Sequence, residues 1–465
     1  MNTIWFPDLT DIDGPKYQVL TESIRQAVLE SHLKPTEKLP PVRELAWALK
    51  ITPGTVARAY KILVDEGVLK AEVGRGTFVA EQNLLEDLLL QFNPKTLPWV
   101  EHVDLRSPGL PELGQGILLK DALVDMASGP LDSMYHNYPN DHSDRPAREA
   151  VYNWLDTQDL GPFEPDDIVL THGGQNAITL IFQTVLRGSD PVVFTEELSY
   201  TGFRHAARLS RAKIVSIPSD DEGLRPDLLH EAIHTYGGQI LCTSPENHNP
   251  TVEQTTMRRR QELAEVISRH KLHVIEDDCY RMGRDRLPGY RALIPESAWY
   301  ISSLSKELTP SLRVGYAVAP KGLANDLRRT RQHSSFGLAV PVAQMAERVL
   351  NDPRSVGVAK AVQERVDDYV RIAVNVLGGF DLSWRNGVPL LWLRLPRGWR
   401  ASAFCRAAER EGVYVRSADD FVLIDGKAPH AIRIAINGRI SPEQFEKGLQ
   451  VLVRLLSNPA DAIEV

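Results

Sequence analysis

The chain has 465 residues and a formal net charge of −8, with 43% hydrophobic and 25% charged residues. This balance suits two or three folded domains and argues against a disordered protein. The acidic total excludes nucleic-acid binding by the whole surface but allows one local basic patch. Cys242, Cys279 and Cys405 share no metal-ligand spacing. The N-terminal residues do not form a signal peptide, and no apolar run has membrane-spanning length, so we expect a reduced, cytoplasmic setting.

Residues 1–82 are predicted to form a small domain of their own. Two short helices across a tight turn, followed by a β-hairpin, are typical of a winged helix-turn-helix. Thr55 is predicted to cap the second of these two helices, and Gly67 to end it. The hairpin tip is expected at Gly74–Gly76. The predicted order is helix 17–32, helix 42–50, helix 55–67, strand 68–73 and strand 76–80.

The charge of this domain differs in sign from that of the whole chain. From Lys34 to Arg75 there are eight Lys or Arg residues and five Asp or Glu residues, a surplus of three positive charges. This surplus suits contacts with phosphates. A helical protein-interaction module is the alternative, but the glycines of the hairpin fit a DNA groove better than a flat protein surface.

The segments EKLPPVRELA, TVARAY, EGVL and GRGTFV together resemble the DNA-binding head of GntR-type regulators. The resemblance implies that Arg43, Thr55 and Arg58 reach double-stranded DNA, and that Arg75 with Gly76 enters the minor groove. The turn TPGT departs from the usual pattern, because Pro53 removes a backbone donor there. The preference for a DNA half-site is therefore left open.

Residues 83–106 are predicted to form a linker. They are rich in proline and turn formers, yet too apolar for a free tether, so we expect parts of them to pack on a folded domain.

From Pro165 onward, apolar runs alternate with helical stretches. This alternation predicts an α/β fold with a mostly parallel central sheet and helices on both faces. Ligands of such sheets bind at the carboxyl ends of the strands.

Several candidate site residues follow predicted strands directly. The Gly173–Gln175 turn opens a helix and suits a phosphate, although glycines alone are a weak signal. Tyr200 could stack on a flat ligand or simply pack against its neighbours. Asp277 ends a buried strand, where a carboxylate is costly without a positive partner. The other candidates are Gly174, Gln175, Asn249, Tyr280, Ser303, Ser305, Lys306 and Arg313.

As a set, these residues match the needs of pyridoxal 5′-phosphate. Its aldehyde needs a lysine, and Lys306 is the predicted Schiff-base lysine. Its ring nitrogen needs a carboxylate, which Asp277 would supply. Tyr280 and Asn249 would donate to the ring oxygen, and Tyr200 would stack on the ring. Gly174, Gln175, Ser303, Ser305 and Arg313 would bind the phosphate.

The order GGQ, Y, NPT, DDCY, SLSK, R from Pro165 to Pro320 resembles a fold type I aminotransferase, in the style of the kynurenine/aminoadipate branch. The resemblance covers residues 107–465, with a large part at about 165–330 and a smaller C-terminal α/β part at about 331–465. It adds Arg433, in HAIRIAING, as the arginine that binds the substrate or effector carboxylate. It implies Lys306, Asp277 and Tyr280 as catalytic residues.

A GntR head joined to such a body resembles the MocR subgroup of regulators. This implies a body that senses an amine or amino-acid effector through Lys306, and a head-to-tail homodimer. A working aminotransferase with an accessory DNA-binding domain is the alternative, because every cofactor residue is retained. A relic that has lost the cofactor is disfavoured by the presence of Lys306 and Asp277.

Two segments depart from the family pattern. Residues Asn249–Val252 read NPTV where NPTG is usual. Because valine resists a positive φ, we expect this loop to turn differently. The segment around Tyr138 also lacks its usual glycine run. The identity of the effector, the operator sequence and the direction of regulation are not predicted.

Overall fold

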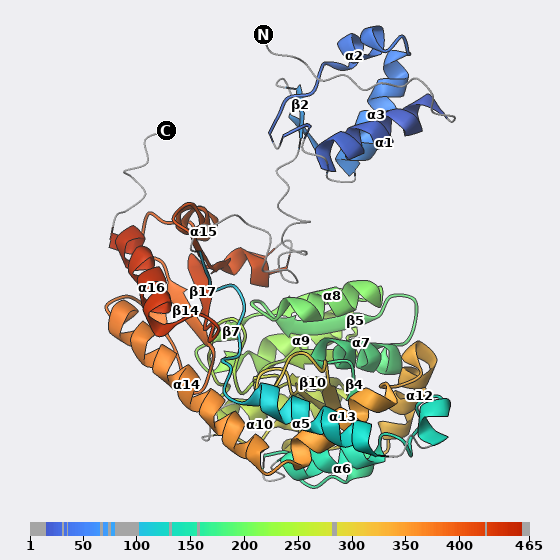
Figure 1. Ribbon diagram of the computed structural model, residues 1–465, viewed down its shortest axis with the longest axis vertical. Coiled ribbons are helices and arrows are strands. Elements are labelled where there is room, and N and C mark those ends of the chain that lie inside the picture. Colours follow the sequence, from blue (N-terminus) through green and yellow to red (C-terminus); the bar gives the residue numbers. More distant parts are fainter. Residues whose placement is uncertain are drawn as a thin grey trace. The chain divides into compact units, whose positions relative to one another are not determined.

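The computed structural model describes residues 15–29, 32–34, 36–65, 68–72, 76–79, 102–129, 133–155, 159–280, 286–423 and 426–457. The chain forms two compact units, Met1–Val100 and Glu101–Val465 (Figure 1). Arg75, Gly67 and most of the predicted linker lie outside the described residues. No helix of the described ranges is long and apolar enough to cross a bilayer.

The first unit has the predicted winged helix-turn-helix order. Leu20, Leu45, Val56 and Leu63 form its apolar core, which the three helices share. The strands form an antiparallel hairpin, with Leu69 opposite Val79. The elements are α1 (Lys16–Leu29), α2 (Val42–Ala48), α3 (Pro53–Asp65), β1 (Leu69–Glu72) and β2 (Gly76–Val79).

The start of α3 corrects one expectation from the sequence. The helix begins at Pro53, two residues before the predicted start. Proline suits this first position because its fixed φ matches the helix and its missing N–H would have no helical partner there. The Thr52 hydroxyl accepts a hydrogen bond from the Thr55 N–H at 3.2 Å. Thr52, rather than Thr55, is therefore the cap.

The second unit is built on a seven-stranded, mostly parallel sheet, as predicted. Only β12 is antiparallel to its neighbours. Most strand residues are buried because helices cover both faces of the sheet. The strand order is β4 (Ile168–Thr171), β12 (Gly315–Val318), β11 (Ala298–Ser303), β10 (His273–Asp277), β9 (Ile240–Thr243), β5 (Val192–Glu196) and β6 (Lys213–Ile217).

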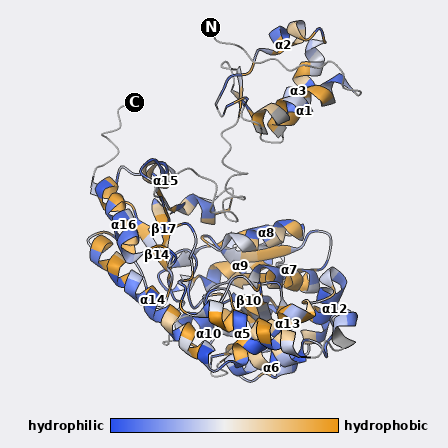
Figure 2. Ribbon diagram, in the orientation of Figure 1, coloured by the Kyte–Doolittle hydropathy of each residue, from blue (hydrophilic) through white to orange (hydrophobic). Residues whose placement is uncertain are grey.

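Successive side chains of a strand point to opposite faces of the sheet, so they pack into two separate hydrophobic cores. Ile275 of β10 packs with one layer of helices, and Val274 packs with the other. Figure 2 shows that α13 and α14 alternate polar and apolar residues, as helices with one covered face do. The first layer is α7 (Gly174–Val185), α8 (Thr201–Leu209) and α12 (Ala324–Ser335). The second is α5 (Gln115–Ser128), α6 (Arg145–Trp154), α9 (Pro226–Tyr236), α10 (Met257–His270), α11 (Tyr290–Leu293) and α13 (Val340–Asn351).

A smaller antiparallel sheet lies beyond the long helix α14 (Arg354–Leu377) (Figure 1). Its order is β13 (Leu382–Ser383), β14 (Leu390–Arg394), β17 (Ala431–Ala435) and β16 (Arg416–Ser417), with α15 (Ala401–Arg410) and α16 (Pro442–Ser457) packed nearby. Short elements complete the unit: β3 (Val103–Asp104) paired with β15 (Val413–Tyr414), β7 (Ser219–Asp220) with β8 (Gly223–Leu224), and 3-10 turns at Ser133–His136, Pro165–Asp167 and Ala418–Phe421.

Candidate functional site

The predicted site residues of the second unit meet at the carboxyl edge of the large sheet. Asp277 ends β10, and Lys306 follows β11 by three residues. The Lys306 Nζ lies 5.8 Å from the centre of the Tyr280 ring. Tyr200 lies close enough to Asp277 and Arg313 for their charges to act on its phenol. Parallel strands bring these loops together because their carboxyl ends share one edge.

The N-terminus of α7 is shaped by glycines and by Arg313. Gly173 has φ +82°, and a Cβ built there would lie 2.7 Å from the Arg313 Nη2. A Cβ on Gly315 would lie 2.5 Å from the Gly173 carbonyl carbon. No side chain of the described residues caps α7. Backbone N–H groups at a helix start and an adjacent guanidinium favour an anion such as a phosphate.

The serines and Gln175 differ in their bonding. Ser305 is 8% exposed, and its buried hydroxyl has no hydrogen-bond partner among the described residues. A buried hydroxyl without a partner is costly unless a ligand bonds to it. Ser303 is buried beside the Cys279 thiol. The Gln175 side chain donates to the Gly202 carbonyl at 2.9 Å, so it ties α7 to α8.

The side-chain carboxylate of Asp277 forms no ion pair with any of the described residues. Its Oδ1 accepts a hydrogen bond from the Cys279 N–H at 3.0 Å. Burial raises the pKa of Asp277 to about 6, because the charged form loses its water. A cation placed beside this carboxylate would reverse that shift. The ring nitrogen of a protonated pyridine is such a cation.

Lys306 and the two tyrosines complete this part of the site. Burial is the main cause that lowers the pKa of Lys306 to about 8, and the charges of Arg433 and Arg313 lower it further. With this pKa, about a tenth of the amine is unprotonated at pH 7, far more than for an exposed lysine, and this unprotonated form is the nucleophile. Burial raises the pKa of Tyr280 to about 12, so its phenol stays a hydrogen-bond donor. Tyr200 precedes α8 and packs edge-on against Phe203 with ring centres 5.7 Å apart.

Arg433 joins the small sheet to the loop after β9. It is 5% exposed, and its Nη1 donates to the Asn249 Oδ1 at 2.9 Å. Its Nη2 donates to the Arg106 carbonyl, while its Nε has no partner in the described part of the chain. Burial lowers the pKa of Arg433 to about 10, which still leaves it charged at neutral pH. No carboxylate of the described residues forms an ion pair with it. It can therefore receive the carboxylate of a ligand.

The loop after Asn249 corrects the expectation drawn from NPTV. Val252 itself adopts φ +69°, so valine takes the left-handed conformation that we expected only a glycine to reach. Its side chain is 2% exposed and packs with Val388 and Trp392. The strained conformation costs about 1–2 kcal/mol, and burial of the valine offsets a similar amount.

Two side chains of the site were not predicted. Cys279 touches the start of α7, since a Cβ on Gly174 would lie 2.4 Å from its sulfur. Its position between Asp277 and Tyr280 in EDDCY was the available signal. Arg416 of β16 lies opposite Arg433 of β17 and pairs with Asp420 at 3.3 Å. The short strand of Arg416 has no clear sequence pattern, so nothing pointed to it.

In the first unit, Arg43 on α2 and Arg58 on α3 are exposed. The Arg58 guanidinium lies over the Tyr17 ring, 4.0 Å from its centre. Gly76 has φ +122°, and a Cβ there would lie 2.8 Å from the Lys38 Cε. Lys38 is exposed and was not predicted as a site residue. The exposed cations on α2, on α3 and beside the hairpin suit a DNA backbone.

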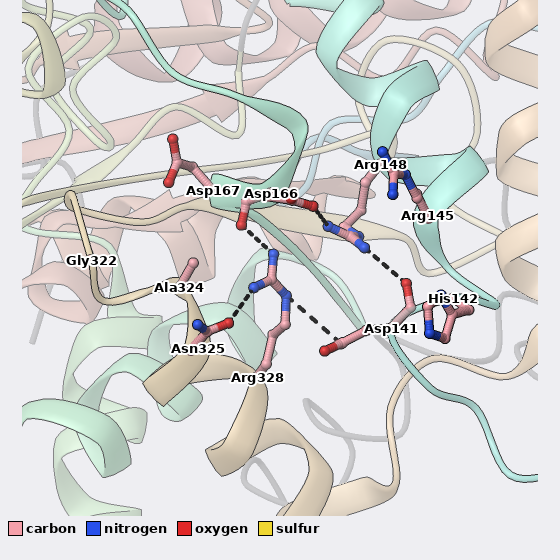
Figure 3. A pocket seen from close by; sticks show the side chains of 10 residues that line it. All are labelled: Asp141, His142, Arg145, Arg148, Asp166, Asp167, Gly322, Ala324, Asn325 and Arg328. Carbon is pink, nitrogen blue, oxygen red and sulfur yellow. Dashed lines mark hydrogen bonds and ion pairs between the residues drawn. The ribbon is translucent and has the colours of Figure 1, made fainter.

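A separate open pocket of about 390 Å³ lies between α6 and α12 (Figure 3). Arg148 donates to Asp166 Oδ1 at 2.8 Å and to the Asp141 carbonyl at 2.8 Å. Arg328 donates to the Asp166 carbonyl and to Asn325. Arg148 pairs with the Asp144 and Asp166 carboxylates, and Arg328 pairs with that of Asp141, so these arginines are already neutralised. We therefore interpret the pocket as a structural charge network.

Comparisons with known proteins agree with both units. The family model for aminotransferase class I and II matches residues 112–452, and the model for bacterial regulatory proteins of the gntR family matches residues 16–79. The chain is 28% identical over 463 residues to the uncharacterised HTH-type transcriptional regulator YdeF of Bacillus subtilis. This match covers 98% of this chain and 97% of YdeF. It is 25% identical to the probable rhizopine catabolism regulatory protein MocR of Rhizobium meliloti, over 69% of this chain and 68% of MocR.

A solved structure shares the fold of the second unit. An archaeal alanine:glyoxylate aminotransferase matches with a TM-score of 0.69 and 24% identity, over 80% of this chain and 94% of that chain. The predicted resemblance to a GntR head joined to an aminotransferase-like body is confirmed. The chain belongs to the aminotransferase class I and II family, whose cofactor is pyridoxal 5′-phosphate, and carries before that domain a DNA-binding helix-turn-helix of the gntR family.

Proposed function

We propose that the protein is a pyridoxal-phosphate-dependent transcription regulator whose second unit senses an amine or amino acid. One observation carries the proposal. A single chain combines a winged helix-turn-helix that exposes Arg43 and Arg58 with a body that gathers Lys306, Asp277 and Arg433. A sensor needs both parts, whereas catalysis alone does not require a fused DNA-binding head.

The cofactor fits the uncompensated groups of the site. Asp277 would bind the ring nitrogen, and Tyr280 and Asn249 would donate to the ring oxygen. Tyr200 would stack on the ring. The start of α7 (Gly174 and Gln175), Ser303, Ser305 and Arg313 would bind the phosphate. When bound, pyridoxal 5′-phosphate supplies an aldehyde that reacts with amines and a ring that withdraws electrons.

Lys306 and Arg433 would determine which chemical groups an effector must carry in order to bind. The Lys306 amine would hold the cofactor and release it to an incoming effector amine of similar reactivity. The Arg433 guanidinium would bind an effector carboxylate with two parallel hydrogen bonds. An α-amino acid or a longer amino acid carries both groups, so this class of molecule suits the site.

The two parts of the body offer a route from effector to DNA. Arg433 belongs to the small sheet and Asn249 to the large part, and the two are bonded directly. An effector carboxylate would compete for Arg433 and change how the two parts pack. The carbonyl of Arg106, at the start of the described body, is bonded to the same guanidinium. In a head-to-tail homodimer this movement would alter the spacing of the two heads. A ligand shifts such an equilibrium only by its difference in affinity for the two states.

A working aminotransferase remains the second candidate, because Lys306 and Asp277 are both retained in a buried site. Release of an oxo acid during incubation with amino acids would favour it. Effector-dependent DNA binding without such release would favour the sensor. The following predictions separate the parts of the proposal.

We predict that Lys306→Ala abolishes covalent attachment of the cofactor. Borohydride reduction of the wild-type protein, followed by peptide mapping, should find the pyridoxyl group on Lys306, since its amine is the one made reactive by burial. Lys321→Ala, which removes an exposed lysine, serves as the matched control and should label normally. Labelling at another lysine would refute this role of Lys306.

We predict that Arg433→Ala keeps the cofactor and basal operator binding but loses the response to carboxylate effectors. Loss of a charged hydrogen-bonding group costs about 1.5–3 kcal/mol, so the effector concentration for half response should rise by about 10–100-fold. The measurement is operator affinity against effector concentration, with Arg371→Ala, an exposed arginine of α14, as control. Arg433→Lys, which keeps the charge, tests whether the two-pronged geometry matters. A wild-type response in Arg433→Ala would remove this residue from the effector site.

We predict that Arg58→Ala weakens operator binding. If Arg58 contacts a phosphate, the salt slope should fall by about one; if it contacts a base edge, binding should weaken by about 1–3 kcal/mol at one position. Lys447→Ala carries the same charge change on the exposed face of α16 and should bind DNA as wild type does. Fluorescence anisotropy with DNA from upstream of the gene, at several salt concentrations, gives both quantities. Identical curves for the two variants would exclude Arg58 from the interface.

A further inference from the structure

Three histidines outside the cofactor site converge on one point. His230 and His234 lie on α9, and His270 is the last residue of α10. Their candidate ligand atoms all lie within 4.8 Å of one another. His230 Nδ1 and His270 Nε2 are 2.8 Å apart. His234 is exposed and the other two are half-buried, so water and ions can reach the cluster.

The geometry suits a transition metal. Residues four apart on a helix lie on the same face, so His230 and His234 present their rings together. Residues 230–234 read HEAIH, a pattern in which two helical histidines bind zinc. Zinc binds imidazole nitrogen at about 2.0–2.1 Å in a tetrahedron, which places ligand nitrogens about 3.3 Å apart. The observed separations of the ligand atoms, 2.8 Å between His230 and His270 and at most 4.8 Å for the other pairs, lie around that value.

The alternative is a packed group of rings without a metal. The ring centres are 4.6 Å (His230–His234), 4.9 Å (His230–His270) and 5.1 Å (His234–His270) apart. Yet, among the described residues, one hydrogen bond joins two of these rings, His230 and His270, and it does not hold His234 in the cluster. The nearby exposed Arg269 repels a cation, although water screens its charge. Three imidazoles still offer the ligand set that zinc, copper and nickel prefer.

We propose that His230, His234 and His270 bind one divalent transition-metal ion of the zinc type, with water as a fourth ligand. The ion would join the middle and C-terminal part of α9 to the C-terminal end of α10. These helices lead into β9 and β10, whose opposite ends lead to Asn249 and Asp277. The metal therefore lies at the other edge of the sheet from the cofactor site, and it would stabilise the folded second unit by binding only that state. Glu231 is not assigned as a ligand.

The test is zinc titration of the full-length protein without a histidine tag, saturated with pyridoxal 5′-phosphate and freed of metals by a chelator. Calorimetry should show about one zinc ion per chain in the wild type. His234→Gln should weaken this binding at least tenfold, because it removes one of three protein ligands. His333→Gln, which removes an exposed histidine of α12, is the matched control and should bind as wild type does. At one zinc concentration, the Tm of the wild type and of the control should rise by more than that of His234→Gln.

A second variant and a second metal keep the test decisive. His270→Gln should show the same loss as His234→Gln, and the cofactor absorbance of each variant reports whether it is folded. Co²⁺ in place of zinc should give visible bands of a tetrahedral site. No zinc binding, equal binding by wild type and His234→Gln, or cobalt bands typical of a thiolate ligand would each overturn the proposal.

Discussion

The site depends on buried charges that do not neutralise one another. Burial raises the pKa of Asp277 to about 6 and lowers those of Lys306 and Arg433 to about 8 and 10. An ion pair would instead lower the pKa of the acid and raise the pKa of the base. The site therefore carries one anion and two cations that desolvation penalises. A cationic ring and an anionic carboxylate would relieve these penalties, and this requirement links the fold to the proposed function.

Hydrogen bonds to neighbouring residues keep other charged groups away from these three side chains. Alternation along β10 directs Asp277 toward α7, while Asp278 bonds to the Tyr300 hydroxyl at 2.8 Å. The buried Arg260 donates to the Pro245 carbonyl and to Glu246, both at 2.9 Å. This arginine fixes the loop that leads to Asn249. Asp278 also pairs with Arg286, whereas no ion pair of the described residues engages Asp277, which is therefore available for a cationic ligand.

Alternating apolar runs predicted the sheet and placed Asp277 and Lys306 at strand ends, because strand period and loop position are local properties of sequence. Arg433 came only through a family resemblance, since its strand lies far along the chain from the other residues. The Val252 conformation was not predictable, because packing against Val388 and Trp392 overrides a local preference. Contacts between distant segments, such as Cys279 with the start of α7, also needed the structure.

The most direct test compares the stability of wild type and Asp277→Asn with and without pyridoxal 5′-phosphate. A carboxyl group whose pKa is raised by folding does not lower the free energy of unfolding at a pH below its unfolded pKa, about 4. The destabilisation grows as pH rises to about 6 and then stays constant. At pH 7.5 without cofactor, Asp277→Asn should therefore be at least as stable as wild type, and with saturating cofactor the order should reverse. A variant that is less stable without cofactor, and that gains as much Tm from cofactor as wild type does, would contradict the account.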